Sequence, residues 1–270
     1  RGIAEADVVI LSGGTSKGQG DLSYRAVEKV RDPGIVAHGV ALKPGKPICL
    51  AASGGKPVVI LPGFPTSAIF TFHEFVAPVI RSLAGRQSEL PGTLSAELAV
   101  RINYEIGRTE YVLVNLVENP DSAIRHPPSA FTTAFPIGKG SGSVTTFSHA
   151  DGFVTIGRHE EFVDAGATVD VTPLSRDIRP ADLVVIGSHC LGLDFLLGEM
   201  QRAGWRTKFL AVGSTAGLDA ACRGQCDLAG IHLLDAETGQ YNRPFVTPEL
   251  ELVCGYTRQQ GIVYRAGDTR

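Results

Sequence analysis

The chain has 270 residues, of which 43% are hydrophobic and 20% charged, so it is long enough for about two domains of roughly 150 residues each. This composition excludes a wholly disordered chain and a mini-protein held together by disulfides. Its 25 Lys and Arg against 28 Asp and Glu leave a net charge of −3 without a block of like charges, which gives no indication of a nucleic-acid partner. Since no apolar run approaches the roughly 18 residues that span a membrane, and the first residues lack the pattern of a signal peptide, we expect a cytoplasmic protein without a membrane partner.

The first 85 residues alternate between strands and helices. Apolar runs predict strands, and apolar residues at helical spacing predict helices. The expected strands cover residues 7–11, 35–42, 48–52 and 58–61, and the expected helices cover residues 21–31 and 66–84. This alternation is typical of an α/β domain with a mainly parallel sheet covered by helices.

The pattern changes twice further along the chain. Short β-rich segments separated by Gly and Pro predict a small β-barrel domain with little helix, and from about residue 179 alternating strands and helices return. The β-rich segments are residues 94–102, 111–117, 152–157 and 167–171; the later elements are strands 183–186 and 208–212 and helices 191–203 and 215–222. We expect three domains, over residues 1–87, 88–176 and 177–270, with the first incomplete at its N-terminus and the last at its C-terminus.

A glycine-rich loop, from Ser12 to Asp21, connects the first expected strand to the first helix. Glycines let backbone N–H groups approach a phosphate, and the helix N-terminus adds partial positive charge. The loop predicts a site for a nucleotide or pterin phosphate, with Asp21 as a ligand of Mg²⁺. Its candidate cofactor-binding residues are Gly13, Gly14, Ser16 and Gly18. The alternative is a plain turn in which Asp21 is only the N-cap of the helix.

Two lysines stand three residues apart in the sequence Lys43-Pro44-Gly45-Lys46-Pro47. The prolines stiffen this loop, so that two ammonium groups at a strand end form a clamp suited to an oxyanion. The alternative is a solvated lysine pair in an ordinary loop.

A rigid turn precedes the longest expected helix. Pro62 and Gly63 lead to Thr66 at its N-terminus, where backbone N–H groups can hold another anion. An ordinary N-cap is the alternative. Because three anion-binding loops follow successive strands, we expect them to converge on one crevice.

The last domain has two serines at the ends of its strands. Ser188 and Ser214 each precede or begin a helix, which makes them candidates for holding an oxyanion in this domain. The alternative is that both serines merely cap helices.

The order of these motifs resembles the molybdopterin molybdotransferase (molybdenum insertase) family. The resemblance covers roughly residues 1–175 and includes the segments 107–111, 140–143 and 151–153, which are similar to that family's C-terminal β-barrel. It implies a molybdopterin-binding (MogA-like) domain followed by the barrel. Residues 227–235 and 241–242 resemble a periplasmic-binding-protein-like domain, of the molybdate or LysR-type substrate-binding kind, that is fused to some molybdotransferases.

The resemblance implies a reaction in which molybdate is inserted into adenylylated molybdopterin, with Mg²⁺ assisting and AMP released. Asp21, Lys43 and Lys46 then fall on catalytic positions, with both lysines next to molybdate. Arg108 and Ser141 are similar to barrel residues that hold the oxyanion, although Ser143 is an alternative for the second. We further expect a homodimer and contact with other molybdenum-cofactor biosynthesis proteins.

Two departures from the family pattern affect the expected pocket. Phe64 stands where the family has Asn, and Lys17 stands where a small apolar residue is commoner. Two other functions stay open on this reasoning: a non-catalytic regulator that senses molybdate or another oxyanion, and a molybdopterin adenylyltransferase on the same fold. The β-rich domain argues against the second.

Overall fold

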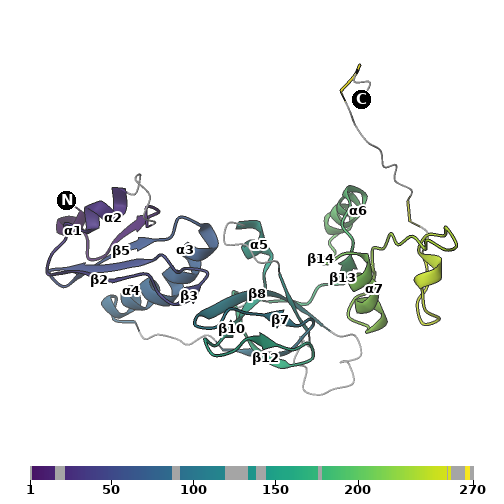
Figure 1. Cartoon of the computed structure of the whole chain (residues 1–270), viewed down its shortest axis with the longest axis horizontal. Helices are drawn as coiled ribbons and strands as arrows, with labels where there is room; N and C mark the ends of the chain where they lie inside the picture. The colour runs from purple at the N-terminus through teal and green to yellow at the C-terminus, as the bar shows by residue number, and fades with distance from the viewer. Residues whose placement is uncertain are drawn as a thin grey trace. The chain divides into compact units, whose positions relative to one another are not determined.

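A computed structural model describes residues 2–15, 22–86, 92–118, 133–137, 144–175, 178–253, 255–256 and 265–267. These residues form two compact units (Figure 1), of which the first ends at Arg179 and the second begins at Pro180. No helix in these ranges is long and apolar enough to cross a membrane.

The first unit begins with a four-stranded sheet in the order β1-β5-β4-β2. Its strands are β1 (Val9–Ser12), β2 (Pro33–His38), β4 (Cys49–Ser53) and β5 (Lys56–Leu61). β1 and β5 are parallel, whereas β4 is antiparallel to both β5 and β2. The α/β class is confirmed, but the expectation of a mainly parallel sheet is wrong for the described strands. Gly54 and Gly55, both with positive φ, form a two-residue hairpin that makes β4 and β5 antiparallel.

Helices cover both faces of this sheet because apolar side chains alternate along β5. Val58 and Ile60 pack toward α1 (Gly2–Glu5) and α2 (Leu22–Val27). Val59 and Leu61 pack toward the long helical segment. That segment consists of α3 (Pro65–Thr71), the π-helical turn η1 (Phe72–Val76) and α4 (Ala77–Leu83). The helix expected over residues 66–84 is therefore present, with one wider turn in its middle.

A closed five-stranded β-barrel completes the first unit, in the order β10-β12-β6-β9-β8 with β8 returning to β10. Its strands are β6 (Leu94–Leu98), β8 (Thr109–Val117), β9 (Thr133–Pro136), β10 (Gly152–Ile156) and β12 (Thr168–Pro173). β7 (Ile102–Asn103) pairs with β11 (Phe162–Val163) beside it. Inward-facing aliphatic side chains, among them Val114, Leu116 and Val171, fill the barrel. The barrel confirms the expected β-rich module. β9 and the helix α5 (Val144–His149) have no counterpart in the sequence-based elements.

One short strand joins the α/β part to the barrel. The strand expected over residues 35–42 ends at His38, because Gly39 takes a positive φ of 90°. The chain then forms β3 (Leu42–Lys43), which pairs in parallel with β8 so that Lys43 lies opposite Glu110. This pairing brings the lysine loop to the mouth of the barrel.

The second unit has a parallel pair, β13 (Leu183–Gly187) and β14 (Thr207–Ala211). The helices α6 (Leu191–Arg202) and α7 (Ser214–Cys222) follow these strands, close to the expected bounds, and η3 (Arg243–Phe245) is a short 3₁₀ turn. Gly217 of α7 packs directly on Gly187 at the end of β13, where a Cβ atom would collide with backbone.

Candidate functional site

The glycine-rich loop and the Pro62–Thr66 turn leave the same edge of the sheet. Ser12 and Leu61 end the parallel strands β1 and β5 side by side. The N–H of Gly13 donates a 3.0 Å hydrogen bond to the carbonyl of Leu61, and a Cβ atom on Gly13 would lie 3.9 Å from the Cα of Gly63. The geometry confirms that the two loops converge, as expected from their places after neighbouring strands.

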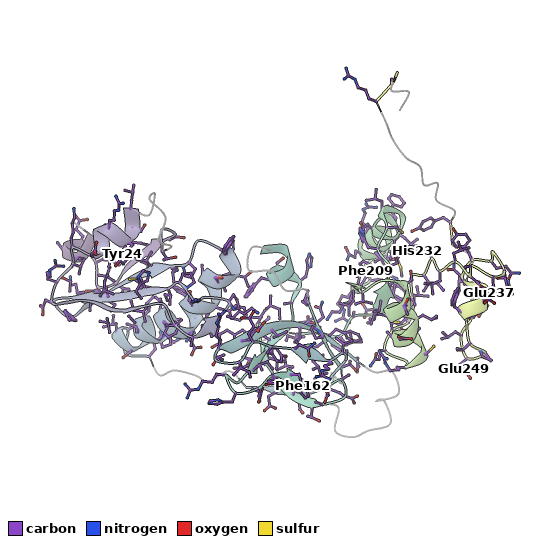
Figure 2. The ribbon with its side chains drawn as sticks, viewed as in Figure 1. Tyr24, Phe162, Phe209, His232, Glu237 and Glu249 are labelled. Carbon is purple, nitrogen blue, oxygen red and sulfur yellow. The ribbon has the colours of Figure 1, made fainter. Side chains whose placement is uncertain are left out.

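Contacts with residues of α2 and β2 hold the first residues of the glycine-rich loop in place. The carbonyl of Gly14 accepts a hydrogen bond from the N–H of Tyr24, and the carbonyl of Thr15 lies 3.1 Å from Nε2 of His38. The ring of Tyr24, which is labelled in Figure 2, stacks on the ring of His38 with their centroids 4.7 Å apart. These contacts fix the backbone of the loop at the point where it leaves the sheet.

The lysine loop is packed against α3 through Gly45. Gly45 has a φ of 125°, and a Cβ atom there would collide with the methyl group of Thr71. Backbone hydrogen bonds from Val40 to the carbonyl of Lys46, and from Ile48 to the carbonyl of Gly45, close the loop. Only glycine allows the loop to come this close to α3. This close packing fixes the positions of the two lysines relative to the helix.

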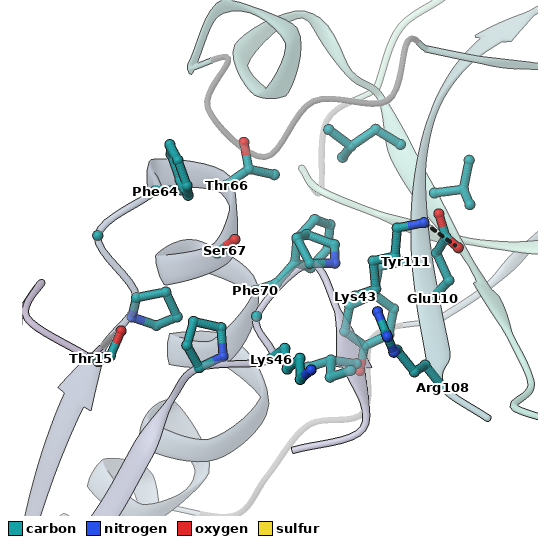
Figure 3. Close-up of a pocket in the computed structure, with 18 of the residues that line it drawn as sticks. Thr15, Lys43, Lys46, Phe64, Thr66, Ser67, Phe70, Arg108, Glu110 and Tyr111 are labelled. Atoms are coloured by element: carbon teal, nitrogen blue, oxygen red, sulfur yellow. Dashed lines mark ion pairs between the residues drawn. The ribbon is translucent and has the colours of Figure 1, made fainter. Parts of the chain in front are cut away.

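The three loops and the barrel strand β8 enclose a cavity of about 780 Å³. Lys43, Lys46 and Arg108 line it on the side of β8, and Thr15 and Phe64 lie across from them (Figure 3). The predicted site residues that line the cavity are Gly14, Lys43, Lys46, Pro62, Gly63, Thr66 and Arg108. Gly13 does not line the cavity, but it lies next to Gly63, which does. Ser16, Gly18, Asp21 and Ser141, with its alternative Ser143, lie outside the described residues.

Carboxylates partly neutralise the cations of this cavity. Nζ of Lys43 lies 3.3 Å from Oε2 of Glu110, whose side chain is buried, and 3.9 Å from Oε1 of Glu105. Oε2 of Glu105 lies 3.3 Å from Nη1 of Arg108. In the described part of the chain no carboxylate pairs with Lys46. The arrangement presents a cluster of positive charge to an anionic ligand.

Sequence reasoning missed the two glutamates. Glu110 lies within the Gly107–Tyr111 segment that carries the resemblance, and Glu105 lies just before it, so the sequence could have singled out both residues. It could not have shown that they pair with Lys43, because Lys43 comes close to them only through the pairing of β3 with β8.

Aromatic rings form the floor of the cavity. The buried ring of Phe70 on α3 stacks on Tyr111 of β8, with centroids 4.9 Å apart, and meets Phe153 edge to face. The Tyr111 hydroxyl donates a hydrogen bond to Glu74 of η1. Burial, and then this carboxylate, raise the pKa of Tyr111, so the phenol stays protonated at neutral pH.

The two serines proposed as ligands in the second unit have different surroundings. Ser214 is buried, and its Oγ accepts a hydrogen bond from the N–H of His232 and lies 3.1 Å from Nδ1 of that ring. Ser188 donates its backbone N–H to the carbonyl of Gly230. The N-caps of α6 and α7 are Cys190 and Gly213, so the alternative that the serines are N-caps is wrong.

Family comparisons agree with this architecture. Residues 1–82 match the probable molybdopterin binding domain, residues 95–174 match the MoeA C-terminal region (domain IV), and residues 197–270 match the PBP superfamily domain. The first unit therefore has the domain order of proteins that join a probable molybdopterin binding domain to the MoeA C-terminal region.

Individual relatives narrow the class. The molybdopterin molybdenumtransferase of Haemophilus influenzae is 30% identical over 173 residues, which are 64% of this chain and 41% of that protein. The one of a Nostoc species is 40% identical over 88 residues, 32% of this chain and 20% of that protein. A crystal structure of the molybdopterin biosynthesis MoeA protein from Pyrococcus horikosii is 34% identical with a TM-score of 0.50, and covers 64% of this chain and 38% of that one.

Over its first unit, the chain is similar to the MoeA-type molybdopterin molybdenumtransferases. It spans less than half the length of these curated relatives.

Proposed function

We propose that this protein acts in molybdenum cofactor biosynthesis by inserting molybdate into adenylylated molybdopterin, with release of AMP. The cavity supports this proposal, because loops suited to a pterin nucleotide open there beside three cations. Molybdate carries two negative charges, and charge-assisted hydrogen bonds from ammonium and guanidinium groups are the contacts that hold such an ion.

The residues divide into two sets by position. We assign the pterin nucleotide to the sheet-edge loops, that is to Gly13, Gly14, Ser16, Gly18, Pro62, Gly63 and Thr66. We assign molybdate to the β8 side, that is to Lys43, Lys46, Arg108 and Ser141. The protein then lowers the barrier by holding both substrates in contact.

Mg²⁺ is the cofactor that the resemblance implies. In the described ranges no group of three or more His, Cys, Asp or Glu side chains could hold a metal ion, and Glu110 is already paired with Lys43. The described residues therefore do not fit a Mg²⁺ site, and the roles proposed for them concern phosphate and oxyanion alone. Asp21 is the residue proposed for the metal.

The relatives' names favour the transferase over the adenylyltransferase and over a regulator without activity. For the second unit we propose that Ser188 and Ser214 hold an anionic ligand, with His232 orienting the Ser214 hydroxyl. A cytoplasmic location, a homodimer and contact with other molybdenum-cofactor biosynthesis proteins complete the proposal.

The experiment is an insertion assay with adenylylated molybdopterin and molybdate that follows AMP release. Arg108→Gln should lower turnover at limiting molybdate by roughly 5- to 150-fold, the range for one lost charge-assisted contact of about 1–3 kcal/mol. Arg101→Gln removes an exposed arginine of the same barrel that pairs with Asp164, outside the cavity lining, and should change turnover little. Equal turnover of Arg108→Gln and the unmodified protein would refute the assigned oxyanion site.

A further inference from the structure

Glu105 holds two of the three cavity cations without lining the cavity itself. It lies in the loop between β7 and β8, with Oε1 3.9 Å from Nζ of Lys43 and Oε2 3.3 Å from Nη1 of Arg108. Its side chain is 63% exposed, whereas Lys43 and Arg108 line the cavity. One exposed carboxylate thus bridges two side chains that line the cavity.

Glu105 is not needed to hold Lys43 in place. Glu110, 8% exposed in its side chain, lies 3.3 Å from the same ammonium group and stands opposite Lys43 in the β3–β8 pairing. Breaking this pair would leave a buried carboxylate without its cation, which is costly, so Glu110 holds Lys43 whether or not Glu105 is bound. An exposed ion pair is worth little and is broken easily by a competing anion.

The charges of the cluster suggest what Glu105 does. Lys43, Lys46 and Arg108 against Glu105 and Glu110 leave one net positive charge. Release of Glu105 raises this to two, which equals the charge of a dianionic oxyanion. While Glu105 is bound, the β8 side of the cavity therefore carries less positive charge than a dianion would neutralise. Once Glu105 leaves, the net positive charge there equals the negative charge of a dianion in magnitude.

We propose that Glu105 is an internal competitor for the oxyanion site: its carboxylate occupies Lys43 and Arg108 in the empty protein and turns to solvent when a tetrahedral dianion binds. This inference rests on the proposed function, because it takes the cation cluster as the oxyanion site. It makes Glu105 a determinant of specificity. A dianion gains twice the Coulomb energy of a monoanion from the two freed cations, and so displaces the carboxylate more readily.

The test is direct binding of sodium molybdate to the full chain by isothermal titration calorimetry, with the monoanion perrhenate as a tetrahedral probe of equal shape. Glu105→Gln should tighten molybdate binding by roughly 3- to 30-fold, the effect of removing one or two exposed ion-pair competitors. The gain for perrhenate should be clearly smaller. Asp164→Asn is the matched control, because Asp164 is also 63% exposed and pairs with an arginine of the same barrel; this variant should bind both ions as the unmodified protein does.

Unchanged or weaker molybdate binding in Glu105→Gln would overturn the inference, and weaker binding would instead make Glu105 a positioning residue. Two further variants separate this failure from a failure of the proposed function. If Lys46→Ala and Arg108→Gln weaken molybdate binding while Glu105→Gln does not strengthen it, only the competitor role is wrong. If neither the unmodified protein nor any variant binds molybdate, both the proposed oxyanion site and the inference about Glu105 are wrong.

Discussion

The Tyr111 hydroxyl donates a 2.8 Å hydrogen bond to Oε2 of Glu74, and so connects strand β8 of the barrel to the π-helical turn η1. A π turn widens the helix by one residue and is often found at functional sites. Here it places a carboxylate where the barrel can reach it. The contact lies at the cavity floor, next to the stacked rings of Phe70 and Tyr111, and it fixes the wall that carries Glu110.

Tyr111→Phe tests this connection. The variant keeps the ring and its stacking on Phe70 but removes the hydroxyl, so the free energy of unfolding should fall by about 1 kcal/mol, the usual net contribution of one hydrogen bond. Urea unfolding followed by circular dichroism measures it. A double-mutant cycle with Glu74→Ala supplies the control. An equal loss from Tyr111→Phe in the Glu74→Ala background would show that the hydrogen bond contributes nothing.

Gly45→Ala should disturb the lysine loop. A Cβ atom at this position meets the Thr71 methyl group, and the positive φ is unfavourable for alanine. We expect a loss of about 1–3 kcal/mol in stability, as for other overpacked sites, together with weaker molybdate binding. Gly54→Ala is the matched control: Gly54 also has a positive φ, but a Cβ atom there has no neighbour within 4 Å. If both variants lose the same stability and bind molybdate equally, packing on α3 does not position the lysines.

The second unit should lose stability in acid through Asp182. Arg206 holds this carboxylate by hydrogen bonds from its backbone N–H, Nε and Nη2, which keep the pKa of Asp182 at about 2, below the ordinary value of 3.8. Because the folded pKa is the lower one, the contribution is complete above the unfolded value and is lost as pH falls toward 2.

Asp182→Asn removes this contribution at every pH. The fluorescence of Trp205, the single tryptophan of the chain, follows unfolding of this unit in urea. Between pH 6 and pH 3 the urea midpoint of the unmodified protein should fall further than that of Asp182→Asn. Equal falls would mean that Asp182 contributes no pH dependence.

The sequence predicted the elements that have a clear apolar period. The strands β5 and β13 and the helix α6 lie within about two residues of their expected bounds. What it did not predict depends on contacts between distant residues. β9 has four residues and is buried, so it shows no alternation. The direction of β4 follows from the Gly54–Gly55 turn, a local signal that was overlooked.

The candidate site divides in the same way. The loops containing Gly14 and Gly63 could be placed together from sequence, because loops after neighbouring parallel strands meet at one sheet edge. Arg108 was predicted as a site residue only because of the family resemblance. Nothing local shows that it lies near Lys43, since the pairing of β3 with β8 joins segments more than sixty residues apart.

That pairing changes how the lysines should be tested. We expect Lys46→Ala to raise the half-saturation for molybdate by roughly 5- to 150-fold, because one charge-assisted contact of about 1–3 kcal/mol is lost. Lys46 has no carboxylate partner in the described ranges, so Lys46→Ala leaves no described carboxylate without its cation. Affinity for the pterin nucleotide should change much less, because the sheet-edge loops hold it.

Lys43→Ala alone would confuse two effects, since it leaves the buried Glu110 carboxylate without its cation, a change that typically costs about 3–5 kcal/mol of stability. The informative variant is Lys43→Ala with Glu110→Gln, which removes both charges of the pair. It should stay folded and weaken molybdate binding in the same range as Lys46→Ala. Calorimetric titration of molybdate and of the nucleotide, in parallel with thermal unfolding, measures all three quantities. If the double variant is folded and binds molybdate as tightly as the unmodified protein, Lys43 is a structural partner of Glu110 and takes no part in holding the oxyanion.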